Sequence, residues 1–388
     1  MFLGFNDFPY GLAEVQKIIL ISKSLIIAGN TVTVICRNGY HNIKFQPQMK
    51  ACGIYESINY VYASGSCFRN EHFFKRRLLQ IKGKINEILL LRNRKKKNNL
   101  DFAILSTRSF SSIVLYYLLA KILKFKIILN YVEYYSAIKK GKLQIAKRLN
   151  DQFFDKYAPS LSDGVFPISE FLINQIKKKS IRKKYLKIPV LTDFDKYNEI
   201  ENNRKQNYFL FCGYAGYKEI IQFIIDSYEL IEDHSVSLFL VINGRASDIE
   251  ELKDYIKKQK KKFKIKVFSR LSEKELFTFY NNATALLIPL RHTLQDIARF
   301  PHKIGEYLAS GNPVISTDYG EINYYFTNMV NMLLANSYDI NLFAKKMQFV
   351  IDHPTESKDI GLKGKEIAYQ QFDYSSIAGA LDNYLNEL

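Results

Sequence analysis

The chain has 388 residues, of which 47% are hydrophobic and none is tryptophan, and this length is enough for two domains with separate cores. Its net charge of +18 is unevenly placed, because residues 1–197 hold 34 Lys and Arg against 13 Asp and Glu, and the remainder holds 22 against 25. Four scattered cysteines show no metal-binding spacing and are typical of a reduced cytosolic protein. Because the excess positive charge lies in residues 1–197, only the first domain is expected to face an anionic surface.

The amino-terminal stretch MFLGFNDFPYGLAEV has no basic segment ahead of an apolar one, so we expect no signal peptide. No apolar run approaches the ~20 residues that a membrane span needs, since SSIVLYYLLA lies between Arg108 and Lys121. The sequence thus predicts a cytoplasmic protein that can attach only peripherally, to the inner face of the cell membrane.

Strand-like and helix-like segments alternate along the chain. In the first half, strands are predicted at 1–5, 30–37, 102–106 and 126–132, with helices at 14–28 and 111–123. After a polar segment at 195–207, strands are predicted at 208–214, 236–244, 264–270, 283–290 and 313–317, with helices at 218–231, 248–259 and 273–282. This alternation predicts an α/β fold of two doubly wound parallel sheets.

The polar segment divides the chain into two Rossmann-like domains. We predict a first domain at residues 1–197, a second at 198–370, and a C-terminal helix at 371–388 that crosses back to the first. Ligands of such sheets bind beyond the carboxyl ends of the strands, so a cleft between the two domains is the expected site.

The stretch RFPHKIGEYLASGNPVIST, at residues 299–317, combines charge with helix punctuation. Pro301 suits the first turn of a helix and Gly311 suits its carboxyl end. Lys303 and Arg299 suit phosphate oxygens, and Glu306 can accept hydrogen bonds from both hydroxyls of a ribose. This polarity predicts a nucleotide diphosphate site, whereas a surface helix with a Lys–Glu pair is the open alternative.

This stretch resembles the nucleotide-binding segment of retaining GT-B glycosyltransferases, in particular glycosyltransferase family 4 (glycosyl transferases group 1). Members usually show P-x-K-x-x-E-Y-x-A-x-G-x-P-V, and the matching residues here are Pro301, Lys303, Glu306, Tyr307, Ala309, Gly311, Pro313 and Val314. The resemblance implies that Glu306 contacts the donor ribose and that the loop Phe300–Lys303, including His302, contacts the diphosphate.

Other segments follow the family's order with departures. FLFCGYAGYKEI matches the usual G-R-x-x-x-x-K-G loop at Gly213 and Lys218, but Tyr214 stands where Arg is usual, so Arg299 or Arg291 is expected to substitute. FLVINGRA keeps only Gly244 of the usual G-x-G.

The family's first glutamate, eight residues before Glu306, is replaced by Ala298. Asp296 is the nearest carboxylate to that position. This departure bears on the identity of the donor sugar more than on nucleotide binding.

In the first domain, NDFPYGLAEVQ resembles the family's P-x-x-G-G loop, with Gly11 matched and Leu12 in place of the second glycine. Glu133 follows a predicted strand, where the resemblance implies a group close to the sugar or acceptor. The alternative is that the carboxylate of Glu133 pairs with a neighbouring lysine and does not contact a ligand. Arg108, after another strand, is a second acceptor-site candidate.

Residues 75–97, KRRLLQIKGKINEILLLRNRKKK, combine dense positive charge with Leu78, Ile81, Ile85 and Ile88 at helical spacing. Such a basic amphipathic helix can lie on an anionic membrane. The alternative is that the apolar stripe packs on the first domain and the charges face water.

The resemblance implies transfer of a hexosyl or N-acetylhexosaminyl group from a nucleotide diphosphate sugar, UDP favoured over GDP, to a glycan or lipid-linked acceptor in surface polysaccharide synthesis. It implies retention of configuration without a metal or a cofactor, with Lys218, Lys303 and Glu133 as catalytic candidates. The alternatives are a GT-B-like nucleotide-sugar epimerase and, in other classes, a nucleic-acid-binding protein or a non-catalytic scaffold. No nucleic-acid-binding motif is found, so nucleic acid is not an expected partner.

Overall fold

The computed structural model describes residues 1–11, 13–43, 48–138, 141, 144–179, 183–198, 206–233 and 235–388. It divides into two compact units, one of Met1–Leu191 with Tyr374–Leu388 and one of Thr192–Asp373, and each is described by itself. The division comes before the expected boundary at residue 197. The reason is that Phe194 and Tyr197 pack within the second unit, against the rings of Tyr369 at 5.4 Å and Phe277 at 4.6 Å.

The described part of the first unit forms a sheet of eight strands in the order β3-β4-β2-β1-β5-β6-β7-β8. The strands are β1 Phe2–Phe5, β2 Thr33–Cys36, β3 Cys52–Tyr55, β4 Ile58–Tyr62, β5 Phe102–Leu105, β6 Lys126–Tyr131, β7 Gly164–Pro167 and β8 Lys184–Tyr185. All neighbours pair in parallel except the hairpin β3–β4. The chain starts at β1, passes through β2 to the edge strand β3 and turns back into β4, and it then crosses to β5 and winds outward on the other side.

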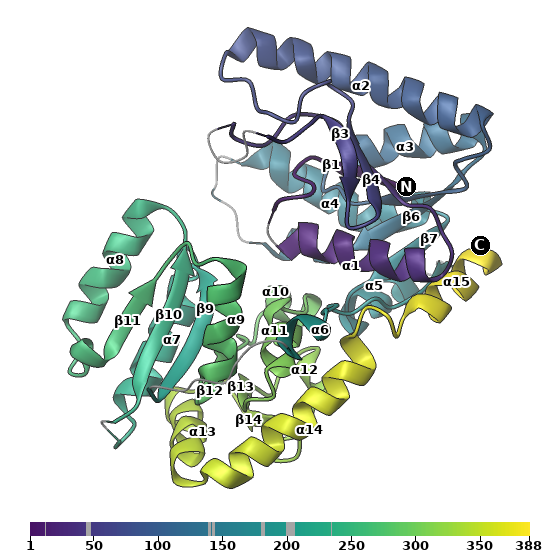
Figure 1. Cartoon of the computed structure of the whole chain (residues 1–388). Helices are drawn as coiled ribbons and strands as arrows, with labels where there is room; N and C mark the ends of the chain where they lie inside the picture. The colour runs from purple at the N-terminus through teal and green to yellow at the C-terminus, as the bar shows by residue number, and fades with distance from the viewer. Residues whose placement is uncertain are drawn as a thin grey trace. The chain divides into compact units, whose positions relative to one another are not determined.

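Helices cover both faces of this sheet. They are α1 Ala13–Ile27, α2 Phe73–Lys96, α3 Phe110–Leu123, α4 Ile145–Leu161, α5 Glu170–Lys178 and α15 Ala378–Glu387, with a short 3-10 helix η1 at Tyr135–Ala137. Right-handed crossovers that wind in opposite directions from β1 place α1 and α2 on opposite faces, as Figure 1 shows. α15 packs on α1, where Leu381 and Leu385 join the core formed by Ile18 and Ile21.

The second unit repeats the same winding in six strands of the described chain, in the order β11-β10-β9-β12-β13-β14, all parallel. The strands are β9 Tyr208–Tyr214, β10 Ser237–Asn243, β11 Ile265–Phe268, β12 Ala285–Ile288, β13 Val314–Thr317 and β14 Leu333–Ala335. The direction of winding reverses between β9 and β12, which are neighbours in the sheet.

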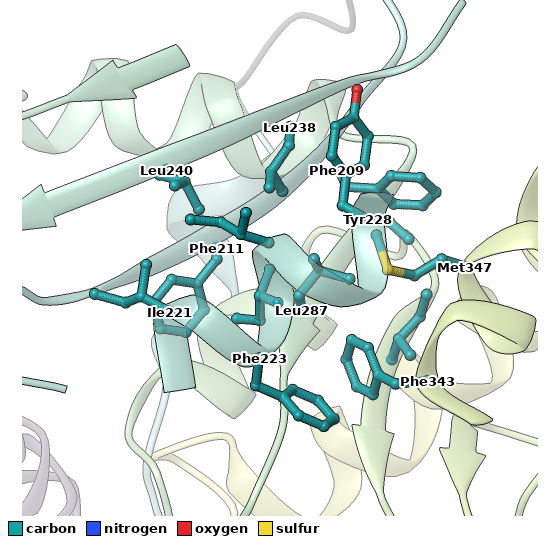
Figure 2. Packing of buried hydrophobic residues seen from close by; sticks show 14 of the residues in the cluster. Phe209, Phe211, Ile221, Phe223, Tyr228, Leu238, Leu240, Leu287, Phe343 and Met347 are labelled. Atoms are coloured by element: carbon teal, nitrogen blue, oxygen red, sulfur yellow. The ribbon is translucent and has the colours of Figure 1, made fainter. Parts of the chain in front are cut away.

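The helices of the second unit are α6 Asp195–Asn198, α7 Lys218–Glu229, α8 Ala246–Lys257, α9 Glu273–Asn282, α10 Leu294–Ala298, α11 Lys303–Ala309, α12 Ile322–Tyr325, α13 Ile340–Asp352 and α14 Pro354–Phe372, with a 3-10 helix η2 at Lys262–Lys264. Figure 2 shows one core of this unit, in which Phe211 and Leu240 of the sheet lie near Ile221 of α7, and the ring of Phe223 points toward Phe343 of α13. Phe343 and Met347 of α13 complete the cluster. These elements hold the carboxyl ends of β9 and β12 in fixed positions.

The predicted α/β fold with two parallel sheets is confirmed, and most predicted elements lie within a few residues of those observed. The sequence analysis missed the β3–β4 hairpin and the short helix α10, which Thr293 caps ahead of α11. It also predicted no element at the positions of β7, β8, β14, α4, α5, α6 and α12 to α14. None of the described helices is long and apolar enough to cross a membrane.

Candidate functional site

The reversal of winding between β9 and β12 brings two loops together at the carboxyl edge of the second sheet. Arg291, which follows β12, pairs with Glu219 of α7 at 3.0 Å between Nη1 and Oε2. Arg299, after α10, donates from Nη1 to the hydroxyl of Tyr217 at 3.1 Å and lies over that ring. In doubly wound sheets this reversal point is where ligands bind.

A single buried carboxylate holds both arginines. Asp296, fully buried in α10, accepts from Nε of Arg291 at 2.9 Å and pairs with Nη2 of Arg299 at 2.7 Å. The hydrogen bond to Asp296 raises the pKa of Arg291, and burial opposes that shift. Asp296 stands two positions before Ala298, where the family pattern has glutamate, and it acts on the arginines from inside the fold.

The second cluster consists of Glu306, Lys303 and Tyr280. Oε2 of Glu306 accepts from the hydroxyl of Tyr280 at 3.0 Å and lies 3.3 Å from Nζ of Lys303. Nζ of Lys303 is also 3.0 Å from the Tyr280 hydroxyl. Burial lowers the pKa of Lys303, but the charges of Glu306 and Cys212 and the hydrogen bond to Glu306 together outweigh it, so the net shift of the pKa is upward. The i,i+3 Lys–Glu pair is therefore present, but a fully buried tyrosine completes it, unlike an ordinary surface pair.

The fold explains why α11 presents these groups. Ile304 and Leu308 are fully buried, and the hydroxyl of Tyr307 accepts from the backbone amide of Cys212 in β9 at 2.8 Å. Gly311 has φ of 68°, the left-handed conformation predicted for the position after the helix. α11 begins at Lys303, so Pro301 precedes the helix and lies outside its first turn.

Phe300 and His302 both precede the first residue of α11 but differ in burial. The side chain of Phe300 is buried, with its ring 5.6 Å from that of Tyr325 and 5.5 Å from that of Phe372, so only its backbone can serve a ligand. His302 occupies the position before α11 and is half-buried.

Lys218 points toward α8. Its Nζ pairs with Glu251 and lies 3.8 Å from Oδ1 of Asp248. The structure thus joins Arg299 to Asp296 and Lys303 to Glu306, and places the charge of Lys218 beside two other carboxylates.

Gly213 lies near the carboxyl end of β9, and Gly244 directly follows the neighbouring strand β10. A Cβ at Gly244 would lie 2.6 Å from the Cβ of Ala215, so glycine is required where the two loops approach each other. At Gly213 a Cβ would meet the ring of Phe211 at 2.7 Å.

In the first unit, the winding reverses between β1 and β5, and Gly11 and Arg108 follow those two strands. Arg108 makes a two-pronged bond to the buried carboxylate of Asp151 and lies over the ring of Tyr135 at 4.9 Å. The bond to Asp151 is the first cause that raises the pKa of Arg108, and Glu133, which follows β6, is one of the charges that add to the rise. Arg108, the second acceptor-site candidate of the sequence analysis, is therefore held in one orientation by Asp151.

Leu12, the departure from the family's second glycine, lies outside the described residues. Within the described ranges, no group of three His, Cys, Asp or Glu side chains is arranged to hold a metal ion. Tyr280 and Asp296 are the site residues that the sequence analysis missed or left without a role.

The two parallel-sheet units together define the GT-B fold. Sucrose-phosphate synthase from Thermosynechococcus elongatus superposes with a TM-score of 0.74 at 13% identity, covering 100% of this chain and 97% of that one. The Anabaena protein HepE, solved with UDP-glucose, superposes with a TM-score of 0.72 at 14% identity, covering 100% and 98%. At such identities the likeness concerns the fold.

The sequence comparisons concern the second unit most directly. Residues 193–367 match the family model Glycosyl transferases group 1, so the second unit carries a domain of that type. An uncharacterized glycosyltransferase of Methanocaldococcus jannaschii is 23% identical over 228 residues, 58% of this chain. The match spans 60% of that relative's length. Both site clusters of the second unit lie within the matched family segment.

Proposed function

We propose that this protein is a glycosyltransferase that moves a sugar from a nucleotide diphosphate sugar to a glycan or lipid-linked acceptor. The observation that carries the proposal is the Tyr280–Lys303–Glu306 cluster close in sequence to the paired arginines, inside a Glycosyl transferases group 1 segment. HepE, which shares the fold, was solved with UDP and with UDP-glucose, and this supports a UDP-sugar over a GDP-sugar as the donor.

Donor binding is assigned first to Glu306. Both of its hydrogen bonds described above reach Oε2, so we assign Oε1 to the ribose hydroxyls. Tyr280 and Lys303 restrict the carboxylate to one orientation, which lowers the entropy cost of binding. Gly213 and Gly244 are assigned to nucleotide binding through their backbone, because a glycine carries no side chain that would keep a ligand away.

Negative charge accumulates on the departing diphosphate during transfer, and fixed cations stabilise it. We assign this role to Arg299 and Lys303, with Arg291 in support because Asp296 holds both arginines. For Lys218 to reach a phosphate it must leave Asp248 and Glu251, so its share is proposed to be smaller.

The acceptor is assigned to the first unit, near Gly11, Arg108 and Glu133, with Glu133 placed to bind or orient the acceptor hydroxyl. We propose that a hexosyl or N-acetylhexosaminyl group is transferred with retention, without a metal or cofactor, for a surface polysaccharide. Residues 75–97 are proposed to contact an anionic membrane at its cytoplasmic face, because Leu78, Ile81 and Ile85 of that helix are exposed.

The assignment of Glu306 is tested by calorimetric titration of UDP and GDP into the full chain. Glu306→Ala is expected to weaken UDP binding at least tenfold, because it removes a charge-assisted acceptor for the ribose. Glu366→Ala, at an exposed glutamate of α14 in the same unit, is the control and should bind UDP as the wild type does. Equal UDP affinity in the wild type and Glu306→Ala would refute the assignment.

The reaction itself is tested by screening nucleotide sugars for turnover and following the product anomer by NMR. Retention is expected, with activity unchanged by a chelator. Interconversion of the donor sugar without any acceptor would instead identify an epimerase.

A further inference from the structure

The two faces of α2 have opposite roles. Gly83, Glu87 and Leu91 face inward, and Glu87 accepts from Nε of Arg37 at 2.7 Å and from the hydroxyl of Tyr116 at 2.8 Å. The opposite face carries an apolar stripe of exposed side chains, which are Phe74 at 82%, Leu78 at 67%, Ile81 at 57% and Ile85 at 54%. The alternative that this stripe packs on the first unit is therefore wrong for these residues, although Ile88 is half-buried.

Two further stripes lie on α3 and α4, the next helices along the chain, and contacts join α2 to α3 and α3 to α4. Both repeat an apolar residue every fourth position, at Phe110, Val114, Leu118 and Ile122 of α3 and at Ile145, Leu149, Phe153 and Tyr157 of α4. Leu118, Ile122 and all four residues of the α4 stripe are exposed. The stacked rings of Phe110 and Phe153, 5.8 Å apart, join the two stripes.

The charges on these three helices are sorted by sign. α2, α3 and α4, each described over its whole length, contain three acidic residues, and all three are buried: Glu87, Asp151 and Asp155. Glu87 and Asp151 pair with arginines, and Asp155 accepts from the hydroxyl of Tyr131 and from the backbone of Ser136. The cations lie at the surface or partly exposed, and they are Lys75, Arg76, Arg77, Lys82, Lys84, Arg92, Arg94, Lys95, Lys96, Lys121, Lys147, Arg148 and Lys156.

We infer that α2, α3 and α4 form one face that docks on a bilayer containing anionic phospholipid. The inference rests on the membrane contact proposed for residues 75–97 and widens it by two helices. Apolar stripes flanked by lysines and arginines match the acyl boundary and the anionic headgroups together. A second copy of the chain would bring the same positive charge to this face, so self-association is opposed by repulsion.

The absence of tryptophan from the sequence allows each helix to be probed separately. Phe74→Trp reports on α2 and Phe153→Trp on α4, and both side chains are exposed, so neither change disturbs a core. Phe263→Trp, at an 87% exposed side chain of the second unit, is the matched control. With phosphatidylserine–phosphatidylcholine vesicles, the first two are expected to show a blue shift and quenching by brominated lipid. The control should show neither.

Charge reversal supplies a second measurement. Lys147→Glu with Arg148→Glu should lower partition onto anionic vesicles about fivefold per cation removed at low salt, and more through reversal. Vesicles of phosphatidylcholine alone should bind weakly in every case.

Each other outcome has a definite reading. A shift at Phe74→Trp without one at Phe153→Trp would overturn the wider face and leave the contact of α2. No shift at either position, in a protein that still binds UDP, would overturn both membrane contacts and leave the transferase proposal standing. A Leu149→Ser, Phe153→Ser variant that loses self-association in sedimentation but keeps vesicle binding would identify a protein interface instead.

Discussion

At the scale of single residues, this protein places polar groups inside the fold to control groups nearer its surface. Asp296 fixes two arginines and Tyr280 fixes a glutamate, and both are fully buried. A buried polar side chain that lost its partners would cost on the order of 1–3 kcal/mol, so these contacts restrict the site to one arrangement.

The hydroxyl of Tyr280 can be removed without changing the packing of its ring. Tyr280→Phe leaves Glu306 with Lys303 alone, and we expect UDP to bind about fivefold more weakly, because one hydrogen bond contributes about 1 kcal/mol. Tyr255→Phe is the control, since that hydroxyl donates to Asp226 elsewhere in the unit. Calorimetry on both variants decides, and equal losses would contradict the role of Tyr280.

The cations are ranked by comparing Arg299→Ala with Lys218→Ala. The first is expected to lower turnover about 100-fold and the second less than tenfold, because Lys218 points toward α8 and must leave two carboxylates there to reach a phosphate, whereas Asp296 holds Arg299 at the carboxyl edge of the sheet. Asp296 keeps Arg291 as a partner in the first variant, so the fold should persist. Steady-state rates at saturating donor are the measurement. A larger loss of turnover in Lys218→Ala than in Arg299→Ala would contradict the ranking.

Lys17 of α1 makes stability depend on pH. Burial lowers its pKa to about 7, with Glu14 opposing, so the folded state binds fewer protons than the unfolded state between about pH 7 and 10.5. Stability contributed at this site therefore rises with pH across that window and is lowest below pH 7. Lys17→Met should raise the free energy of unfolding by a few kcal/mol at pH 6 and by much less at pH 10. Denaturant titrations at both pH values test it, and a constant difference would contradict it.

At the scale of elements, α2 is held by a small polar contact instead of a broad apolar one. Gly83 sits so close to β2 that a Cβ there would lie 2.2 Å from the carbonyl oxygen of Arg37. The contact of Glu87 with Arg37 and Tyr116 then fixes the rotation of the helix about its axis. The outward direction of the apolar stripe follows from these contacts.

Two helical glycines of the first unit test this docking with opposite signs. Gly83→Ala should lower the free energy of unfolding by about 1–3 kcal/mol, because the new methyl group overlaps the backbone of Arg37. Gly379→Ala in α15, where no atom lies within 4 Å of the added Cβ, should be neutral or stabilising by up to about 1 kcal/mol. Thermal unfolding of both variants is the measurement, and two shifts of the same sign would contradict the account.

The sequence predicted helices and strands well where one periodicity dominated, as in α7, β9 and α2. It predicted Lys303, Glu306 and Arg299 as neighbours because they lie within one short stretch. It did not predict Tyr280 beside Glu306, because only the packing of α9 on α11 joins them. The sequence pattern also could not predict that the apolar stripe of α2 faces outward. The face that carries Gly83 and Glu87 packs on the unit instead.

At the scale of the whole molecule, the chain leaves the first unit at Leu191 and re-enters it at Tyr374. The predicted return of the C-terminal helix, at 371–388, corresponds to α15 at Ala378–Glu387 on α1. The hydroxyl of Tyr384 accepts from the amide of Val165 at 3.0 Å and donates to the carbonyl of Lys184 at 2.9 Å, which ties α15 to β7 and β8.

Removal of residues 374–388 should therefore weaken the first unit specifically. Leu381 and Leu385 leave the core, so the first unit should unfold at a lower temperature, while UDP should still stabilise the second unit. Tyr384→Phe should give a smaller shift in the same direction, because it loses only the hydrogen bonds. Calorimetry with and without UDP separates the two units, and an unchanged first transition would contradict this assignment.

The two crossings between the units run next to each other: Thr192 pairs with Asp373, and its amide donates to the carbonyl of Phe372 at 2.8 Å. The second unit is thus inserted into the chain of the first unit, and its two connections to that unit are adjacent. Because we propose that the second unit binds the donor, exchange of Thr192–Asp373 for the matching segment of a relative would test whether donor choice moves with that unit. Fusion tags at either chain end would remain on the first unit and leave the exchanged part untouched.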